Sequence, residues 1–192
     1  ALDSGVAANM VWAIHGWFRG PDGKLRKEIR SPVLRTRVRK LAENLIGQRK
    51  GTTQPAAETA SMADLFDGVP GYENLLEPLR QYALGLEDST EIGAAGMVGV
   101  VADKVLYMSV DGAALKALID NVGMERLQQL AEDGSLDITD ALASAEDMIR
   151  KGMLPKLKSV AELESAVVDI LETGMHHELQ HVLQGVEGFE NG

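Results

Sequence analysis

The fold expected for this chain is organised around the stretch Met175-His-His-Glu-Leu-Gln-His181, which contains the pattern His177-Glu178-x-x-His181. On a helix, residues four apart lie one turn above each other, so both imidazoles point in the same direction. Two neutral imidazole nitrogens can then bind one Zn²⁺, and a Glu beside them can accept a proton from a metal-bound water. We therefore predict a C-terminal helix with His177 and His181 as metal ligands and Glu178 as general base.

The sequence before this pattern specifies the start of that helix. Ser159-Val-Ala-Glu162 is a capping box, in which the Ser oxygen and the Glu side chain satisfy free backbone N–H groups. Gly174 lies in the helix interior, where it costs about 1 kcal/mol relative to Ala, so we expect another backbone or a substrate to pass close by. One stripe with helical spacing is predicted to face inward: Leu163, Val167, Ile170, Gly174, His177 and His181.

A catalytic zinc site normally has a third protein ligand, and the chain offers two candidates for it. Glu187 lies six residues beyond His181 and follows Gly185, close to the arrangement in which a metzincin helix stops at a Gly and the chain turns back. Glu190 is the second candidate. The chain has no Cys, so its metal ligands must be His or carboxylate, which also fits a reducing compartment. The candidates for stabilising an oxyanion are Tyr82, Tyr107 and His15.

Two other interpretations of the His pair stay open. In one of them, His177 and His181 are helix residues that make ordinary hydrogen bonds. In the other, zinc binds without turnover and holds the C-terminal tail against the helix.

The whole chain predicts an α+β fold, in which a small antiparallel sheet from 82–109 is packed by several helices and the C-terminal helix is zincin-like. Its domains are predicted as a basic helix and hairpin module over 1–50 and an α+β domain over 61–192, with 47–60 as a linker or loop. A single compact domain is the alternative. Helices are expected up to Ile14, over 32–46 after a cap at Ser31, over 62–66 starting at Ser61, from a cap at Asp111 to Gly134 with a break at Gly123, and over 138–150. Extended pieces are expected at 16–19 and 24–29, joined by a turn at 20–23, and at 82–87, and a hairpin is expected at 96–109.

The net charge of −10 hides an asymmetry along the chain. Residues 1–50 hold 11 Lys and Arg against 4 Asp and Glu, whereas residues 51–192 hold 8 against 25. Either the basic segment 19–50 binds an anionic partner, or it lies on its own acidic body. Specific nucleic-acid recognition is doubtful, because no aromatic residue interleaves the basic run after Phe18. No apolar run approaches the roughly 20 residues of a membrane span, and no signal peptide is expected.

Three segments resemble a family found in very large multi-domain proteins of phages and other mobile elements, the large polyvalent protein-associated domains of the type with a C-terminal His-Glu-x-x-His. The segments are His15-Gly-Trp-Phe-Arg-Gly-Pro-Asp-Gly-Lys24 with Glu28-Ile29, Met62-Ala-Asp-Leu-Phe66 running on to Leu79, and 177–189. The chain departs from that family at Leu25, where an aromatic residue is common. This resemblance implies a zinc metallopeptidase encoded by a phage and located in the virion or the host cytoplasm. Its expected partners are a polypeptide substrate or other phage proteins.

Overall fold

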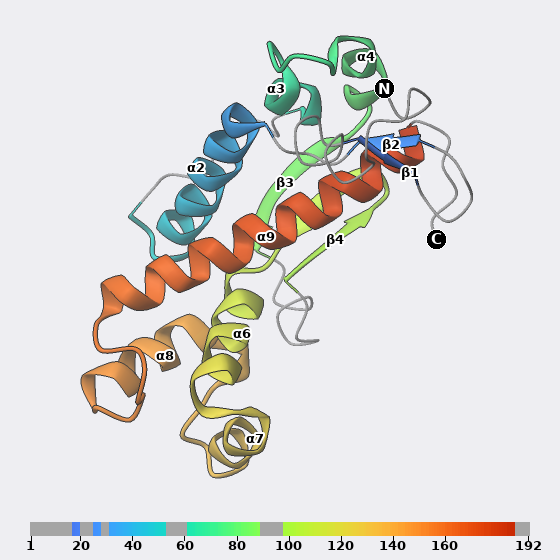
Figure 1. Ribbon diagram of the computed structural model, residues 1–192. Coiled ribbons are helices and arrows are strands. Elements are labelled where there is room, and N and C mark those ends of the chain that lie inside the picture. Colours follow the sequence, from blue (N-terminus) through green and yellow to red (C-terminus); the bar gives the residue numbers. More distant parts are fainter. Residues whose placement is uncertain (1–16, 20–24, 28–30, 53–60, 89–97, 187–192) are drawn as a thin grey trace.

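The computed structural model describes residues 17–19, 25–27, 31–52, 61–88 and 98–186 (Figure 1). They form an α+β fold that is mostly helical and contains one small mixed sheet, as the sequence predicts at the level of fold class; a zincin-like fold is not confirmed. The expected helix up to Ile14 and the turn at 20–23 lie outside the described residues. The helices other than the C-terminal one are α2 (Pro32–Arg49), α3 (Met62–Phe66), α4 (Leu76–Leu79), α6 (Val110–Val122), α7 (Met124–Glu132) and α8 (Ala141–Arg150), with short 3₁₀ turns at Glu73–Leu75 and Ile138–Asp140.

Helix α9 (Val160–Val186) is the central element of the fold, because helices α2, α6 and α8 and the sheet all pack against it. Its 27 residues span about 40 Å at 1.5 Å per residue. Figure 1 shows α9 running across α2, α6 and the sheet, and it contacts all of them. None of the described helices is long and apolar enough to cross a membrane. The buried residues of α9 are Leu163, Val167, Val168, Leu171, Glu172, Met175, Leu179, Val182 and Leu183.

The predicted cap of α9 is present with one change. The Ser159 hydroxyl accepts a hydrogen bond from the Glu162 N–H at 3.2 Å, while the Glu162 carboxylate accepts from the N–H of Lys158 at 2.7 Å. Glu162 thus reaches one residue further back than a strict capping box requires. Ser31 and Ser61 cap α2 and α3 as expected, and α2 continues to Arg49, three residues beyond the predicted end.

The expected hairpin is formed by β4 (Gly99–Ala102) and β5 (Val105–Met108), which pair antiparallel. Asp103 and Lys104 connect them with positive φ angles of 48° and 62°. The prediction of an antiparallel sheet is wrong for the third strand, β3 (Ala83–Asp88), because β3 pairs parallel to β5. The strand order is β3-β5-β4, so β5 lies in the middle of the sheet between its parallel and its antiparallel partner. Strands β1 (Trp17–Arg19) and β2 (Leu25–Lys27) form the separate antiparallel pair expected near the N-terminus.

The N-cap of helix α6 lies two residues before the position that the sequence predicts. Ser109, and not Asp111, is its N-cap, and the Ser109 hydroxyl accepts from the Gly112 N–H at 2.9 Å. The Asp111 carboxylate is buried and accepts from the Leu142 N–H and from the Arg49 Nε, so it joins α6 to α8 and α2. Gly123 separates α6 from α7 at a φ of 85°, as expected.

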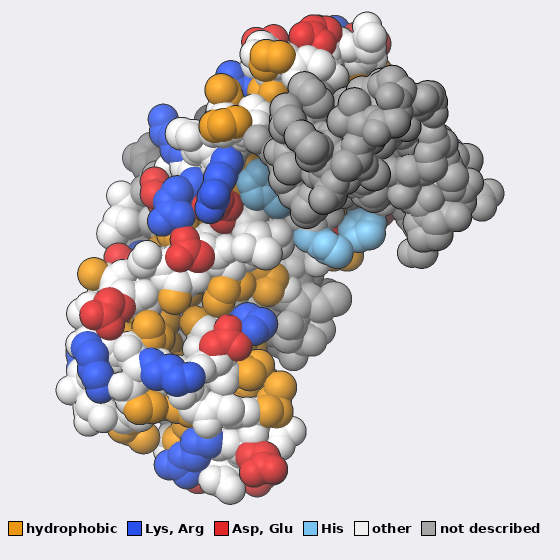
Figure 2. Space-filling model, in the orientation of Figure 1, with side chains coloured by type: hydrophobic (Ala, Val, Ile, Leu, Met, Phe, Trp, Pro, Cys, Tyr) orange, Lys and Arg blue, Asp and Glu red, His pale blue; other side chains and the backbone are white. Residues whose placement is uncertain are grey.

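The cations of α2 lie on the acidic body of the same chain. Arg35 and Arg39 pair with Glu172 on α9, Arg49 pairs with Asp111, and Lys50 pairs with Glu146 and Glu164. Figure 2 shows basic and acidic side chains interleaved where α2 meets α9. These ion pairs support the second interpretation of the charge asymmetry for the C-terminal part of the basic segment. The buried residues of α2 belong to the same core as those of α9.

Candidate metal and substrate site

His177 and His181 lie side by side near the C-terminal end of α9, as the four-residue spacing predicts. Their Nε2 atoms are 3.0 Å apart, and their rings meet edge to face with centroids 4.5 Å apart. Both side chains are exposed, and the pale-blue imidazoles are visible at the surface in Figure 2. Two nitrogens thus converge on one point that solvent can reach.

The predicted inward stripe is wrong at this end of the helix. Leu163 and Val167 are buried, but the stripe then drifts sideways, since Ile170 and Gly174 are half-buried and both His are exposed. The helix buries Met175, Leu179 and Val182 instead, because α2, α6 and the sheet set which side of α9 is covered. The His pair therefore lies beside the buried face of α9, with both imidazoles exposed.

The separation of the two nitrogens fits a shared metal. Two nitrogens bound to one tetrahedral zinc at about 2.0–2.1 Å lie about 3.3–3.4 Å apart, slightly more than the 3.0 Å of this pair. A hydrogen bond from one Nε2 to the other also fits 3.0 Å, since one neutral tautomer can donate and the other accept. The pair therefore matches the donor atoms and spacing of two zinc ligands without excluding the direct hydrogen bond.

The third ligand is the part of the site that the described residues do not supply. No group of three His, Asp or Glu side chains that could hold a metal is found within the described ranges. Both candidates, Glu187 and Glu190, lie outside those ranges. Gly185 lies inside α9, which continues to Val186, so the helix does not stop at this Gly as the metzincin-like prediction requires.

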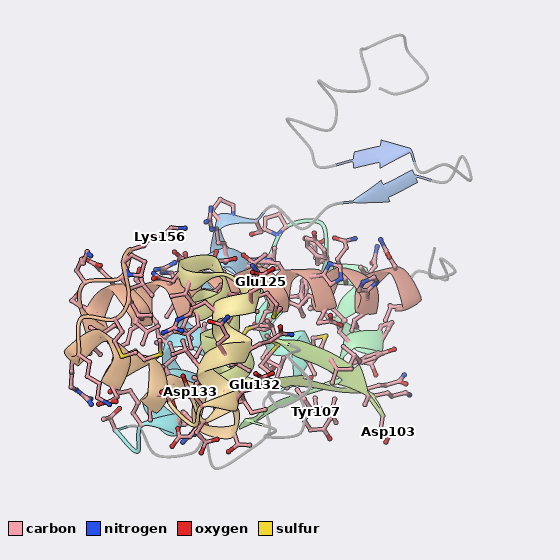
Figure 3. The ribbon with its side chains drawn as sticks, turned by 90° about the horizontal axis from the view of Figure 1, so that it is seen from below. Asp103, Tyr107, Glu125, Glu132, Asp133 and Lys156 are labelled. Atoms are coloured by element: carbon pink, nitrogen blue, oxygen red, sulfur yellow. The ribbon has the colours of Figure 1, made fainter. Side chains whose placement is uncertain are left out.

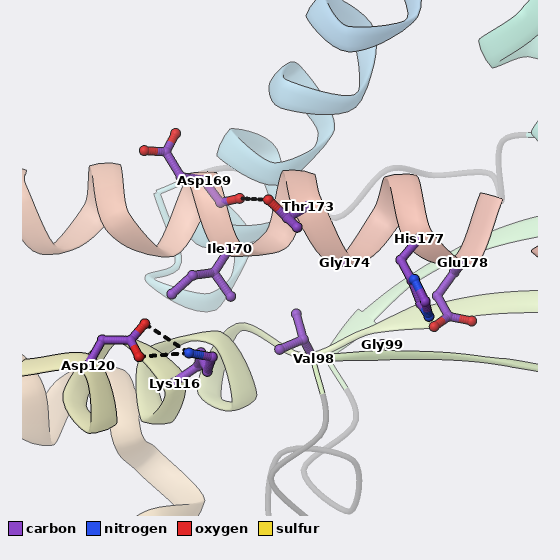
Figure 4. A pocket seen from close by; sticks show the side chains of 10 residues that line it. All are labelled: Val98, Gly99, Lys116, Asp120, Asp169, Ile170, Thr173, Gly174, His177 and Glu178. Carbon is purple, nitrogen blue, oxygen red and sulfur yellow. Dashed lines mark hydrogen bonds and ion pairs between the residues drawn. The ribbon is translucent and has the colours of Figure 1, made fainter. Parts of the chain in front are cut away.

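Glu178 lies at one end of a pocket of about 550 Å³ between α9, α6 and the start of β4. Figure 4 shows Glu178 and His177 projecting from α9 to the same side, toward β4, while Lys116 and Asp120 of α6 lie at the opposite end. Glu178 is half-buried. The complete described lining is Val98, Gly99, Lys116, Asp120, Asp169, Ile170, Thr173, Gly174, His177 and Glu178.

Gly174 has close neighbours, but they are side chains and not the backbone that the sequence suggested as one possibility. A Cβ atom at this position would lie 3.0 Å from Val98 Cγ1 and 3.3 Å from Met108 Cε. The pocket opens beside these neighbours. Gly99 is more tightly packed still, because a Cβ there would lie 2.5 Å from Met108 Sδ.

His176 is half-buried, on a side of the helix where Glu172 and Arg35 lie near it. Burial lowers the pKa of His176, while Glu172 raises it and Arg35 lowers it further. Its Nδ1 atom is buried without a hydrogen-bond partner. Glu172 is itself buried and accepts hydrogen bonds from Arg35 Nε at 2.6 Å and Arg39 at 3.1 Å. These contacts fix α9 against α2 just before the His-Glu-x-x-His segment.

The two described tyrosine candidates for an oxyanion stabiliser lie elsewhere. Tyr107 alternates with the buried Leu106 and Met108 on β5, and Figure 3 shows it on the side of the sheet away from α9. Neither Tyr107 nor Tyr82 lines the pocket. His15 lies outside the described residues.

The sequence did not identify the pocket itself, because its walls come from three separate segments. Val98 precedes β4, Lys116 belongs to α6 and Ile170 to α9, and their meeting depends on how these elements pack. Gly174 was the one residue whose local sequence context pointed to this region of α9.

Neither protein-family models, nor curated proteins, nor solved structures gave a match to this chain.

Proposed function

We propose that this chain is a zinc-dependent metallopeptidase domain of a phage or mobile-element protein, acting in the virion or the host cytoplasm. His177 and His181 are the proposed metal ligands, with Glu187 as the third and Glu178 as general base. The phage setting rests on the resemblance of the sequence alone. The observation that carries the enzymatic proposal is the pair of Nε2 atoms 3.0 Å apart beside a Glu that lines a pocket of about 550 Å³.

The chemistry needed for peptide hydrolysis can be divided between the metal and the chain. Zinc bound at such a pair lowers the pKa of a coordinated water and polarises a carbonyl. Glu178 is one residue from His177 on the same side of α9, where its carboxylate can accept a proton from the attacking water and return it to the leaving amine. The pocket beside it has the size of typical ligand pockets, about 300–1,000 Å³, and can hold part of a polypeptide.

Glu178→Gln tests this assignment, because the amide keeps the shape of the side chain but cannot accept the proton. We expect peptide hydrolysis to fall by about 10²–10⁴-fold while bound zinc stays unchanged. Cleavage of a fluorogenic peptide library and zinc content would be measured on the same samples. The matched control is Glu125→Gln, at an exposed position on α7 that does not line the pocket. Unchanged hydrolysis by the Glu178 variant would contradict its role as the base.

A second candidate function is a structural or virion-associated protein that retains the site without turnover. The observation that favours it is that the described residues supply only two converging ligands, so a third ligand from the tail would also hold that tail to α9. Thermal unfolding with and without a chelator separates the two functions. A large loss of stability on chelation without any peptide cleavage indicates structural zinc, whereas a small loss together with cleavage indicates an enzyme.

A further inference from the structure

The pocket beside Glu178 has apolar walls over most of its length. Figure 4 shows Val98 and Ile170 projecting into the space between α9 and the elements below it, and the backbones of Gly99 and Gly174 complete this part of the lining. Both glycines are tightly packed, since a Cβ at Gly174 would lie 3.0 Å from Val98 Cγ1 and a Cβ at Gly99 would lie 2.5 Å from Met108 Sδ, so the side chain of Val98 can lie directly against α9 as part of the pocket wall.

The charges at the far end of the pocket are already paired within the chain. Lys116 Nζ donates to both carboxylate oxygens of Asp120, at 2.7 and 2.9 Å. Asp169 accepts from Arg39 at 2.7 Å. A charged side chain entering this end would have to compete with these ion pairs, whereas an apolar side chain would not.

The length of the pocket corresponds to a short peptide. Asp169 and Glu178 are nine residues apart on α9, which is about 13–14 Å along the helix axis. An extended peptide covers this distance with about four residues at 3.3–3.6 Å each.

We infer that this pocket binds the segment of about four residues on one side of the cleaved bond and selects uncharged, apolar side chains there. The inference rests on the proposed function for the identity of the bound molecule as a substrate. It adds the substrate class, which is polypeptides with an apolar stretch adjoining the cleaved bond.

Binding to metal-free protein tests the pocket separately from catalysis. Fluorescence anisotropy on chelator-treated protein would compare two labelled tetrapeptides, one of leucine and phenylalanine and one of glutamate and serine. We expect the apolar tetrapeptide to bind at least about tenfold more tightly, from the burial of two or more large side chains. Equal affinities for the two tetrapeptides would overturn the inference.

Ile170→Glu places a charge in the apolar wall and should weaken binding of the apolar tetrapeptide at least about tenfold. The matched control is Ser165→Glu, which introduces the same side chain at an exposed position of α9 outside the pocket and should bind as the wild type does. Wild-type affinity in the Ile170 variant would place the binding site elsewhere. Circular dichroism would verify that both variants are folded.

Lys116→Ala provides a second variant that leaves the core untouched, since the Lys116 side chain is 51% exposed. Without its partner, Asp120 becomes an uncompensated anion at the far end of the pocket. Two apolar tetrapeptides would be compared, one with a lysine at its first position and one with a lysine at its last. One of the two should bind the Lys116→Ala variant about two- to fivefold more tightly than it binds the wild type. No gain for either peptide would contradict the placement of the segment along α9.

The two proposals can fail independently in these measurements. If the chain holds no zinc or Glu178→Gln retains activity, the proposed function fails while the binding data on metal-free protein still decide the apolar pocket. If zinc and cleavage are present but peptides bind without regard to side-chain type, the pocket inference alone is overturned.

Discussion

Gly174 is the residue at which the packing of α9 and the shape of the pocket depend on a single missing side chain. A Cβ atom there would lie 3.0 Å from Val98 Cγ1, closer than an ordinary van der Waals contact. A helix gains about 1 kcal/mol when an interior Gly is replaced by Ala, provided that space is available. The balance between these two effects is therefore set mainly by Val98, and to a smaller degree by Met108, whose flexible Cε would lie 3.3 Å from the same Cβ.

A double-mutant cycle on these two residues should show this coupling. We expect Gly174→Ala to stabilise the wild type little or not at all, but to stabilise the Val98→Ala variant by about 1 kcal/mol, because the shorter side chain removes the contact. Urea unfolding would give the four free energies of unfolding. Gly185→Ala is the matched control, since a Cβ there meets nothing within 4 Å and should not depend on Val98. Additive effects of the two substitutions would contradict the close approach.

At the scale of elements, the turn of the β4–β5 hairpin has an unfavourable backbone conformation that lowers the stability of the fold. Asp103 and Lys104 both have positive φ angles, 48° and 62°, which side-chain-bearing residues adopt unfavourably. Such two-residue turns prefer Asn-Gly. The double substitution Asp103→Asn with Lys104→Gly should therefore raise the free energy of unfolding by about 1 kcal/mol, although it removes the exposed hydrogen bond from Lys104 Nζ to Gln81.

Thermal or urea unfolding would measure that change. Lys104→Ala serves as the control, because it removes the same hydrogen bond without relieving the backbone, and it should not stabilise the protein. Destabilisation by the Asn-Gly turn would show that the positive φ angles are not the limiting feature of this hairpin.

Helix limits could be predicted from the sequence wherever a local signal sets them. Ser31 with Pro32, Ser61, Gly123 and Ser159 all mark ends that the structure confirms, because a cap or a positive φ acts within a few residues. Asp111 looked like such a cap, but its carboxylate instead accepts hydrogen bonds from Arg49 and Leu142, which are 62 and 31 residues away. The parallel pairing of β3 with β5 was missed for the same reason, since strand partners are set by non-local packing.

The same distinction between local and non-local causes applies to the candidate site. The meeting of His177 with His181 follows from helical spacing and could be predicted. Which side of α9 is buried depends on the contacts with α2, α6 and the sheet, so the exposed flank of the His pair and the pocket lined by Val98, Lys116 and Ile170 could not.

Across the whole molecule, α2 and Lys50, which directly follows it, are joined to α6, α8 and α9 by ion pairs as well as by the shared core. Arg49 is central to this arrangement, because its Nε contacts the buried Asp111 at 2.9 Å and its guanidinium also reaches Asp140 at 2.7 Å. Asp111 is only 1% exposed, so the loss of Arg49 leaves a buried carboxylate with too few partners.

We expect Arg49→Ala to lower the free energy of unfolding by about 3 kcal/mol. Arg80→Ala is the control, since Arg80 pairs with Glu77 at the surface and such pairs contribute about 0–1 kcal/mol. Urea unfolding of both variants would measure the difference. Asp111→Asn combined with Arg49→Ala should recover part of the loss, because the remaining amide carries no charge; a loss no larger for Arg49 than for Arg80 would contradict the buried network.

The claim on which the functional account depends is that His177 and His181 together bind zinc. The most direct test is the zinc content of the whole chain by elemental analysis, for the wild type and for His177→Ala, His181→Ala and His176→Ala. The predicted result is one zinc per chain in the wild type and in the His176 variant, with loss of zinc in the other two. A wild type without zinc, or equal zinc in all three variants, would contradict the account.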